Sequence, residues 1–127
     1  MRAIDTNVLV RLFARDDARQ VAAAEAFVEK GAWISQLVLA ETVWVLDSVY
    51  NLSAKQIAHA VEMLLEHANL TVQEGEVVAR ALEQFRAHPK LGFSDCLILE
   101  IARKNGHTPL GSFDRQLSEL EGAERIS

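Results

Sequence analysis

The feature that most constrains the fold of this chain is an alternation of short apolar runs with longer segments whose apolar residues recur at helical spacing. Runs of three or four apolar residues suit short strands, and the longer segments suit amphipathic helices. Short strands that alternate with helices favour a parallel sheet covered on both faces. The predicted strands start at residues 3–4 and continue with 32–34, 70–72, 108–110 and a last edge strand at 123–126.

Capping residues delimit the predicted helices. Asp16 or Asp17 can accept hydrogen bonds at the start of one helix, and Ser35 can do so at the start of another. Ser53 and Gln56 have the spacing of a capping box. The predicted helices cover residues 7–14, 17 to about 30, 36–50, 54–68, 74–87, 94–104 and 114–120.

These elements predict an α/β fold in one domain of 127 residues. We expect three layers, with a short central parallel sheet of four to five strands and helices on both faces. The single cysteine, Cys96, cannot form an internal disulfide, which fits a reducing cytoplasm. No apolar run approaches the length of a membrane span, so we expect a cytoplasmic protein that has no contact with a membrane.

The net charge of -5 argues against a protein that holds nucleic acid by overall basicity. Bound divalent cations would change this balance, because two such ions add +4 and bring -5 to -1. An acidic chain of this kind can therefore still act on an anionic substrate.

Four acids stand where a merely solvating side chain is not expected. Asp5 ends the first predicted strand, and Asp114 follows the fourth. Asp95 heads an apolar helix, and Glu41 lies within another helix that is apolar nearly all round, so its side chain is hard to leave fully in water. Strand ends and the helix starts that follow them share one edge of a parallel sheet, so we expect these acids to meet there.

Each acid also has a simpler structural interpretation. Asp5, Asp95 and Asp114 could cap helix N-termini, which carry orphan N–H groups and partial positive charge. Glu41 could pair with an arginine or reach solvent. Capping explains these acids one at a time, whereas a metal site explains their shared edge.

Carboxylates that converge repel one another unless cations compensate them. Oxygen ligands without cysteine or histidine favour Mg²⁺ or Mn²⁺ over zinc. Such ions, bound singly or in pairs, activate water and stabilise the attacking and leaving oxygens of a phosphodiester. A metal-dependent nuclease is the resulting hypothesis.

The four acidic motifs resemble those of the PIN-domain family. The matching segments are residues 5–9, Glu41 in its apolar helix, residues 93–98 and residues 112–117. In length and motif order the chain is most similar to the VapC-type toxins of toxin–antitoxin pairs. Ser94 stands where the family often has alanine and Ser112 where it often has threonine, and neither departure removes an acid.

The resemblance implies a toxin that cleaves RNA with Mg²⁺ or Mn²⁺, forms a homodimer and is silenced by a cognate VapB-like antitoxin. It implies that Asp5, Glu41, Asp95 and Asp114 hold the metal and are the catalytic residues. Thr6 and Ser112 would orient carboxylates or water, and Asn7 would support the site.

Two other classes of function stay open. A phosphotransferase of the haloacid-dehalogenase type also begins with an acid after the first strand, but it expects a second aspartate two residues later, where this chain has Asn7. A binding or scaffold domain would use the acids as helix caps and the apolar helices for dimerisation.

Overall fold

The computed structural model describes all residues from Met1 to Ser127, in two compact units, Met1–Gly75 and Glu76–Ser127. The first unit contains three strands in one parallel sheet of order β1-β2-β3, in which Ala3 pairs with Trp33 and Trp33 with Thr71. Its elements are β1 (Arg2–Ala3), α1 (Thr6–Ala14), α2 (Ala18–Val28), β2 (Ala32–Ile34), α3 (Gln36–Ser48), α4 (Ala54–Glu66) and β3 (Leu70–Val72).

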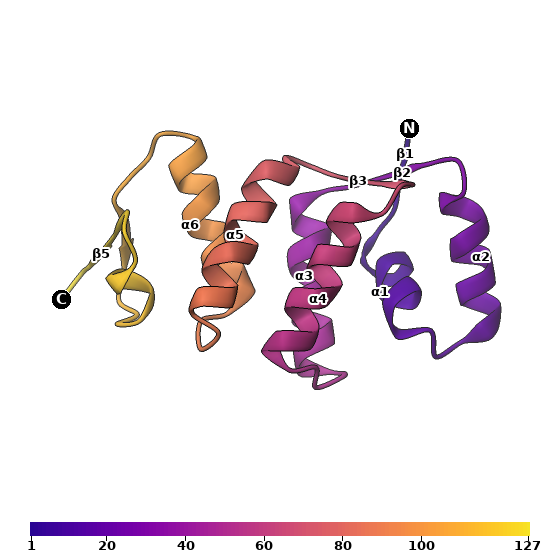
Figure 1. Cartoon of the computed structure of the whole chain (residues 1–127), viewed down its shortest axis with the longest axis horizontal. Coiled ribbons are helices and arrows are strands. Elements are labelled where there is room, and N and C mark those ends of the chain that lie inside the picture. Colours follow the sequence, from indigo (N-terminus) through magenta and orange to yellow (C-terminus); the bar gives the residue numbers. More distant parts are fainter. The chain divides into compact units, whose positions relative to one another are not determined.

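The core of the first unit follows from the strand and helix periodicities. In β2, Ala32 and Ile34 are fully buried and Trp33 points outward, because side chains alternate between the two faces of a strand. Helix α1 buries Leu9 and packs against both α2 and α3, while α4 packs against β3 (Figure 1). The capping box predicted from Ser53 is present at the start of α4.

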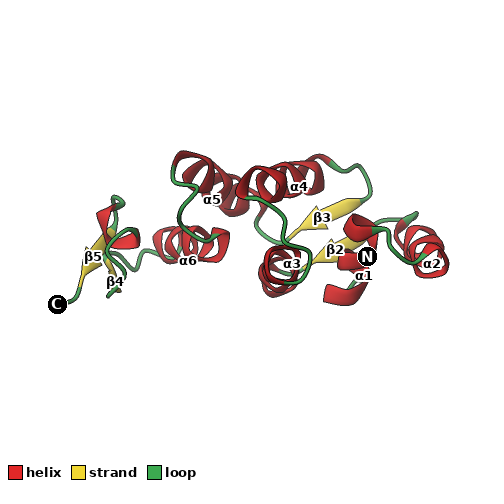
Figure 2. Cartoon of the chain, turned by 90° about the horizontal axis from the view of Figure 1, so that it is seen from below, coloured by secondary structure: helices red, strands yellow, loops and turns green.

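The second unit consists of two helices followed by a short parallel pair of strands. Its elements are α5 (Gly75–Ala87, which begins at the unit boundary), α6 (Phe93–Lys104), β4 (Leu110–Ser112), a 3₁₀ turn (Leu117–Glu119) and β5 (Ala123–Arg125). Figure 2 shows β4 and β5 side by side, and they pair in parallel with Ser112 opposite Arg125. The rings of Phe85 and Phe93 pack edge to face at 5.8 Å between centroids, which joins α5 to α6.

The predicted α/β class is confirmed, with short parallel strands between helices. The strands at 32–34 and 70–72 occur where they were predicted. That the whole chain works as a single nuclease domain stays a prediction. No helix combines the length and the apolar character needed to cross a lipid bilayer.

Three local predictions were wrong. The fourth strand spans residues 110–112 instead of 108–110, because Pro109 has no N–H to donate and the ladder starts where the Leu110 N–H bonds the Gly122 carbonyl at 2.8 Å. The predicted helix at 114–120 shrinks to one 3₁₀ turn. Strand β1 is exposed instead of buried, since it lies at the edge of its sheet, and burial begins only at Ile4.

Candidate active site

Asp5 lies between the end of β1 and the first turn of α1. It adopts an extended conformation as the N-cap, and its Oδ1 accepts a hydrogen bond from the Val8 N–H at 3.1 Å. Asp5 therefore does cap helix α1, as its simpler interpretation predicted, but this hydrogen bond uses only one of the two carboxylate oxygens. The side chain is exposed, so Asp5 can cap α1 and still face a ligand.

Thr6 links the start of α1 to the middle of α3. Its hydroxyl donates a hydrogen bond to Oε1 of Glu41 at 2.7 Å. Because Thr6 directly follows Asp5, this bond places the Glu41 carboxylate beside the turn that Asp5 caps. The first unit thus brings two of the four acids to one place, and the orienting role of Thr6 stays a prediction.

Glu41 is exposed, and the expectation that its side chain would be hard to leave in water was wrong. Helix α3 buries Leu39, Val43 and Leu46, which lie on one face only. The opposite face carries Glu41 together with Leu37 and Trp44, whose exposed fractions are 70% and 64%. Helix α3 therefore has apolar residues on both faces but buries only one of them.

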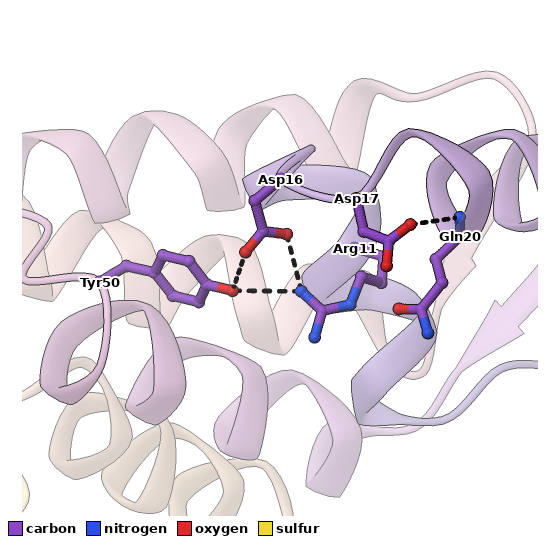
Figure 3. Close-up of polar contacts among 5 residues, drawn as sticks. All are labelled: Arg11, Asp16, Asp17, Gln20 and Tyr50. Atoms are coloured by element: carbon purple, nitrogen blue, oxygen red, sulfur yellow. Dashed lines mark hydrogen bonds and ion pairs between the residues drawn. The ribbon is translucent and has the colours of Figure 1, made fainter.

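A second polar network fixes the far end of α1 against α3 (Figure 3). One terminal nitrogen of Arg11, Nη1, donates a hydrogen bond to Oδ1 of Asp16 at 2.7 Å. The same nitrogen donates a second hydrogen bond to the Tyr50 hydroxyl at 3.2 Å. The Tyr50 hydroxyl donates to Oδ2 of Asp16 at 2.8 Å. Helix α1 is thus attached near α3 at both ends, by Thr6 and by Arg11, which limits movement of Asp5 relative to Glu41. Arg11, Asp16 and Tyr50 share no helical or strand periodicity, so this network could not be predicted from the sequence pattern.

Tyr50→Phe tests the network through the carboxyl group of Asp16. The hydrogen bond from Tyr50 is the main cause that lowers the pKa of Asp16, and Arg11 lowers it further. We expect the variant to raise this pKa toward the ordinary value of 3.8. A lowered pKa contributes stability above the unfolded-state value that is lost as the pH falls through the folded-state value. The variant should lose less stability on acidification, and an NMR titration of the Asp16 carboxyl carbon checks the shift. An unchanged pKa would contradict the network.

Asp95 lies in the first turn of α6, in the second unit. Burial raises the pKa of this carboxyl above its ordinary value, the negative charge of Asp114 raises it further, and a hydrogen bond with the Gly92 backbone opposes both. Two carboxylates that repel each other at a partly buried position are a common arrangement at functional sites. The second unit thus brings the other two acids within electrostatic reach of each other.

Ser112 and Asp114 form a compact turn after β4. The Ser112 hydroxyl accepts a hydrogen bond from the Asp114 N–H at 3.0 Å, and Oδ1 of Asp114 accepts one from the Leu117 N–H at 2.9 Å. Like Asp5, Asp114 caps the turn that follows it with one oxygen while the side chain stays exposed. Ser112 therefore contacts the backbone of Asp114, and its role in orienting a carboxylate or water stays a prediction.

Asn7 makes no side-chain hydrogen bond and is exposed. It lines a cavity of about 390 Å³ together with Asp5, Arg11, Gln20 and Phe27. Asn7 therefore lies next to Asp5 but does not hold it, and its supporting role stays a prediction.

The available donors are carboxylate and hydroxyl oxygens, which suit Mg²⁺ or Mn²⁺. Cys96 does not join them: it is fully buried, and burial raises the pKa of its thiol to about 11. Neither unit alone gathers three acidic, histidine or cysteine side chains into a metal-binding group. The acids come in pairs, Asp5 with Glu41 and Asp95 with Asp114, and the convergence of all four stays a prediction.

Comparison with known proteins assigns the family. The family model described as PIN domain matches residues 3–123, a range that contains all four acids and both supporting hydroxyl residues. No curated protein matches the chain. PIN domains are generally metal-dependent nucleases that act on nucleic acid. Since the match covers nearly the whole chain, the protein belongs to the PIN-domain family.

Proposed function

We propose that this protein is a metal-dependent endoribonuclease in which Asp5, Glu41, Asp95 and Asp114 together hold one or two Mg²⁺ or Mn²⁺ ions. The observation that carries the proposal is the family match over residues 3–123 combined with the pairing of these four acids. A bound divalent ion would lower the pKa of the attacking water and stabilise the charge that develops on the phosphodiester. The expected products carry a 5′-phosphate and a 3′-hydroxyl.

The chain's own contribution is to hold the acids in place before substrate binds. The hydroxyl of Thr6 restricts the Glu41 carboxylate, and the cap on α1 fixes Asp5 through its Oδ1. The turn at Ser112 does the same for Asp114. Side chains that are already oriented lose little conformational freedom when an ion and a substrate bind. Less free energy is then spent on ordering them, and more remains to stabilise the charged transition state.

We also propose that the nuclease is the toxin of a type II toxin–antitoxin pair, a cytoplasmic homodimer that a VapB-like antitoxin keeps silent. The support is the resemblance in length and motif order to VapC-type toxins. A gene for a small DNA-binding antitoxin directly beside the gene for this chain would favour the proposal. Growth arrest on expression, relieved by co-expression of the neighbouring protein, would test it.

The deciding experiment is an RNA cleavage assay with purified protein in Mg²⁺ or Mn²⁺, followed by excess chelator. We expect cleavage that stops on chelation and returns when the metal is restored. Chemical analysis of the cut ends should find 5′-phosphates. Activity that survives the chelator with 2′,3′-cyclic phosphate ends would point to a contaminating metal-independent ribonuclease.

A scaffold domain is the alternative outcome of this assay, because Asp5 and Asp114 do cap the turns that follow them. Folded protein that cuts no RNA in either metal, and whose expression leaves cells unharmed, would favour the scaffold. In that case the metals should also leave the melting temperature unchanged.

Thr6→Val tests whether orientation of Glu41 matters for catalysis. The replacement keeps the shape of the side chain and removes the hydroxyl that donates to Glu41. Loss of an outer contact to a metal-binding group generally costs about 10- to 100-fold in metal affinity or activity, and we expect a decrease in this range. Thr71→Val is the matched control, because Thr71 is an exposed residue of β3. Equal activities in both variants would exclude the orienting role.

A further inference from the structure

The segment that carries Asp114 is held together mainly by its own hydrogen bonds. The Leu110 N–H bonds the Gly122 carbonyl at 2.8 Å, and the Ile126 N–H bonds the Ser112 carbonyl at 2.9 Å. Asp95, in contrast, lies on α6. The distance between the two acids therefore depends on how residues 110–126, the C-terminal segment, are attached to α6.

Arg103 provides such an attachment from the last turn of α6. Its Nη2 donates a hydrogen bond to the Glu121 carbonyl oxygen. The guanidinium also lies close against Gly122: a Cβ at this position would be 3.0 Å from both terminal nitrogens. Gly122 has a φ of +92°, which side chains rarely adopt, so both the turn and the close approach of Arg103 depend on glycine.

Glu100 lies one helical turn before Arg103 and is only 4% exposed. Its Oε1 is 3.3 Å from Nε of Arg103, and its Oε2 accepts a hydrogen bond from the side-chain amide of Gln84 at 3.3 Å. A buried carboxylate is costly unless its oxygens are paired, and here both are. With Nε held by Glu100 and Nη2 by Glu121, the guanidinium has one orientation.

Glu100 and Arg103 do not belong to the four acidic motifs. An ion pair on the surface would contribute little to stability. In this pair the carboxylate of Glu100 is buried, and the guanidinium of Arg103 also donates to the Glu121 carbonyl. The neighbouring Lys104 forms the ordinary kind of pair, 3.5 Å from Glu76 of α5, with both side chains about half exposed.

We propose that Glu100 and Arg103 are positioning residues that hold the C-terminal segment on α6 and so fix the separation of Asp114 from Asp95. This inference rests on the proposed function only where it concerns cleavage. The attachment itself is a property of the fold and can be measured without substrate.

The test compares Arg103→Met with Lys104→Met, which removes an adjacent cation from the same helix. Amide hydrogen exchange is measured at Leu110 and Leu117 in the C-terminal segment and at Leu99 within α6. We expect Arg103→Met to speed exchange at Leu110 and Leu117 by about tenfold or more while Leu99 stays protected. Lys104→Met should change none of these rates. Unchanged exchange in Arg103→Met would overturn the attachment.

The functional consequence is measured as a split between kcat and KM. A displaced Asp114 should lower kcat and Mn²⁺ affinity by about 10- to 100-fold in Arg103→Met, with KM for RNA close to that of the wild type. Arg103→Lys should not rescue, because a single ammonium cannot contact Glu100 and the Glu121 carbonyl as the planar fork does. Full activity in Arg103→Met, despite faster exchange, would overturn the positioning role.

Gly122→Ala provides an independent perturbation of the same contact. The added Cβ meets the guanidinium and strains the turn, so it should speed exchange at Leu110 as Arg103→Met does. The double variant should speed exchange by less than the product of the two single effects, since both substitutions disturb the contact with Arg103 while only Gly122→Ala adds strain in the turn. A fully multiplicative effect would contradict a shared contact. A wild type that binds Mn²⁺ but cuts no RNA would refute the proposed function, while the exchange rates would still decide the attachment.

Discussion

Asp5→Asn should reduce RNA cleavage by about 10²- to 10³-fold or more while the protein stays folded. Asparagine is as good an N-cap as aspartate, so the hydrogen bond to the Val8 N–H and helix α1 should survive. What the variant loses is the negative charge that a hard cation requires. The measurement is the rate of cleavage at saturating Mn²⁺, together with the circular dichroism of the variant.

The chain contains a matched control for Asp5. Asp17 caps α2 in the same way, with its Oδ1 accepting from the Gln20 N–H at 3.1 Å, the distance found for the cap of α1. Asp17→Asn therefore removes a capping charge without touching the candidate site and should leave cleavage unchanged. Equal losses in both variants would reduce Asp5 to a structural cap.

A metal-binding measurement distinguishes the roles of Asp5 and Asp17 without any substrate. Millimolar Mg²⁺ or Mn²⁺ should raise the melting temperature of the wild type and of Asp17→Asn but not of Asp5→Asn, because a ligand stabilises only the folded state that binds it. The same shift in all three proteins would remove Asp5 from the metal site.

Asp95→Asn should likewise abolish cleavage, and it should do so without destabilising the metal-free protein. Burial and the charge of Asp114 raise the pKa of Asp95, so the ionised carboxylate is disfavoured in the folded state. An acid with a raised pKa contributes stability below its unfolded value, and that stability is lost as the pH rises through the folded value. The contribution of Asp95 to the stability of the wild type should therefore decrease as the pH rises above 3.8, and this part of the pH dependence should be absent from Asp95→Asn.

Thermal denaturation in chelator, as a function of pH, checks this prediction. Asp47→Asn, at an exposed position of α3, is the control and should follow the wild type. Asp114→Asn should reduce this pH dependence only in part, because it removes the repelling charge but leaves the burial of Asp95, the larger cause. A metal-free Asp95→Asn protein with a much lower melting temperature and an unchanged pH dependence would show that Asp95 is mainly a helix cap.

Much of the fold could be predicted because its signals are local. The capping box at Ser53 depends on a spacing of three residues within one turn, and the strand at 32–34 on an apolar run bounded by Gly31 and Ser35. The fourth strand was predicted two residues too early because the apolar pattern ignores that Pro109 has no backbone N–H. The strand pairing begins at Leu110, whose N–H bonds the Gly122 carbonyl.

The candidate site likewise contains residues that the sequence proposed and residues that only the structure distinguishes. The four acids were proposed from their positions at strand ends and in apolar helices; in the structure Thr6 contacts Glu41, and Ser112 contacts the backbone of Asp114. Glu100 was not singled out, because a glutamate three residues before an arginine on a helix is a common surface pattern. Only its burial between Gln84 and Arg103 distinguishes it.

The sequence by itself determined the α/β class and the starts of α3 and α4, and it proposed the four acids, because caps, periodicity and residue chemistry act over a few residues. The tertiary structure alone decided that Asp5 lies beside Glu41 through Thr6, that Asp95 feels the charge of Asp114, and that Arg103 reaches the Glu121 carbonyl. These contacts join residues far apart in the chain, and their formation depends on which faces pack together. Helix α3 illustrates the reason: it carries apolar residues on all its faces, yet packing buries one face and leaves Glu41 exposed on another.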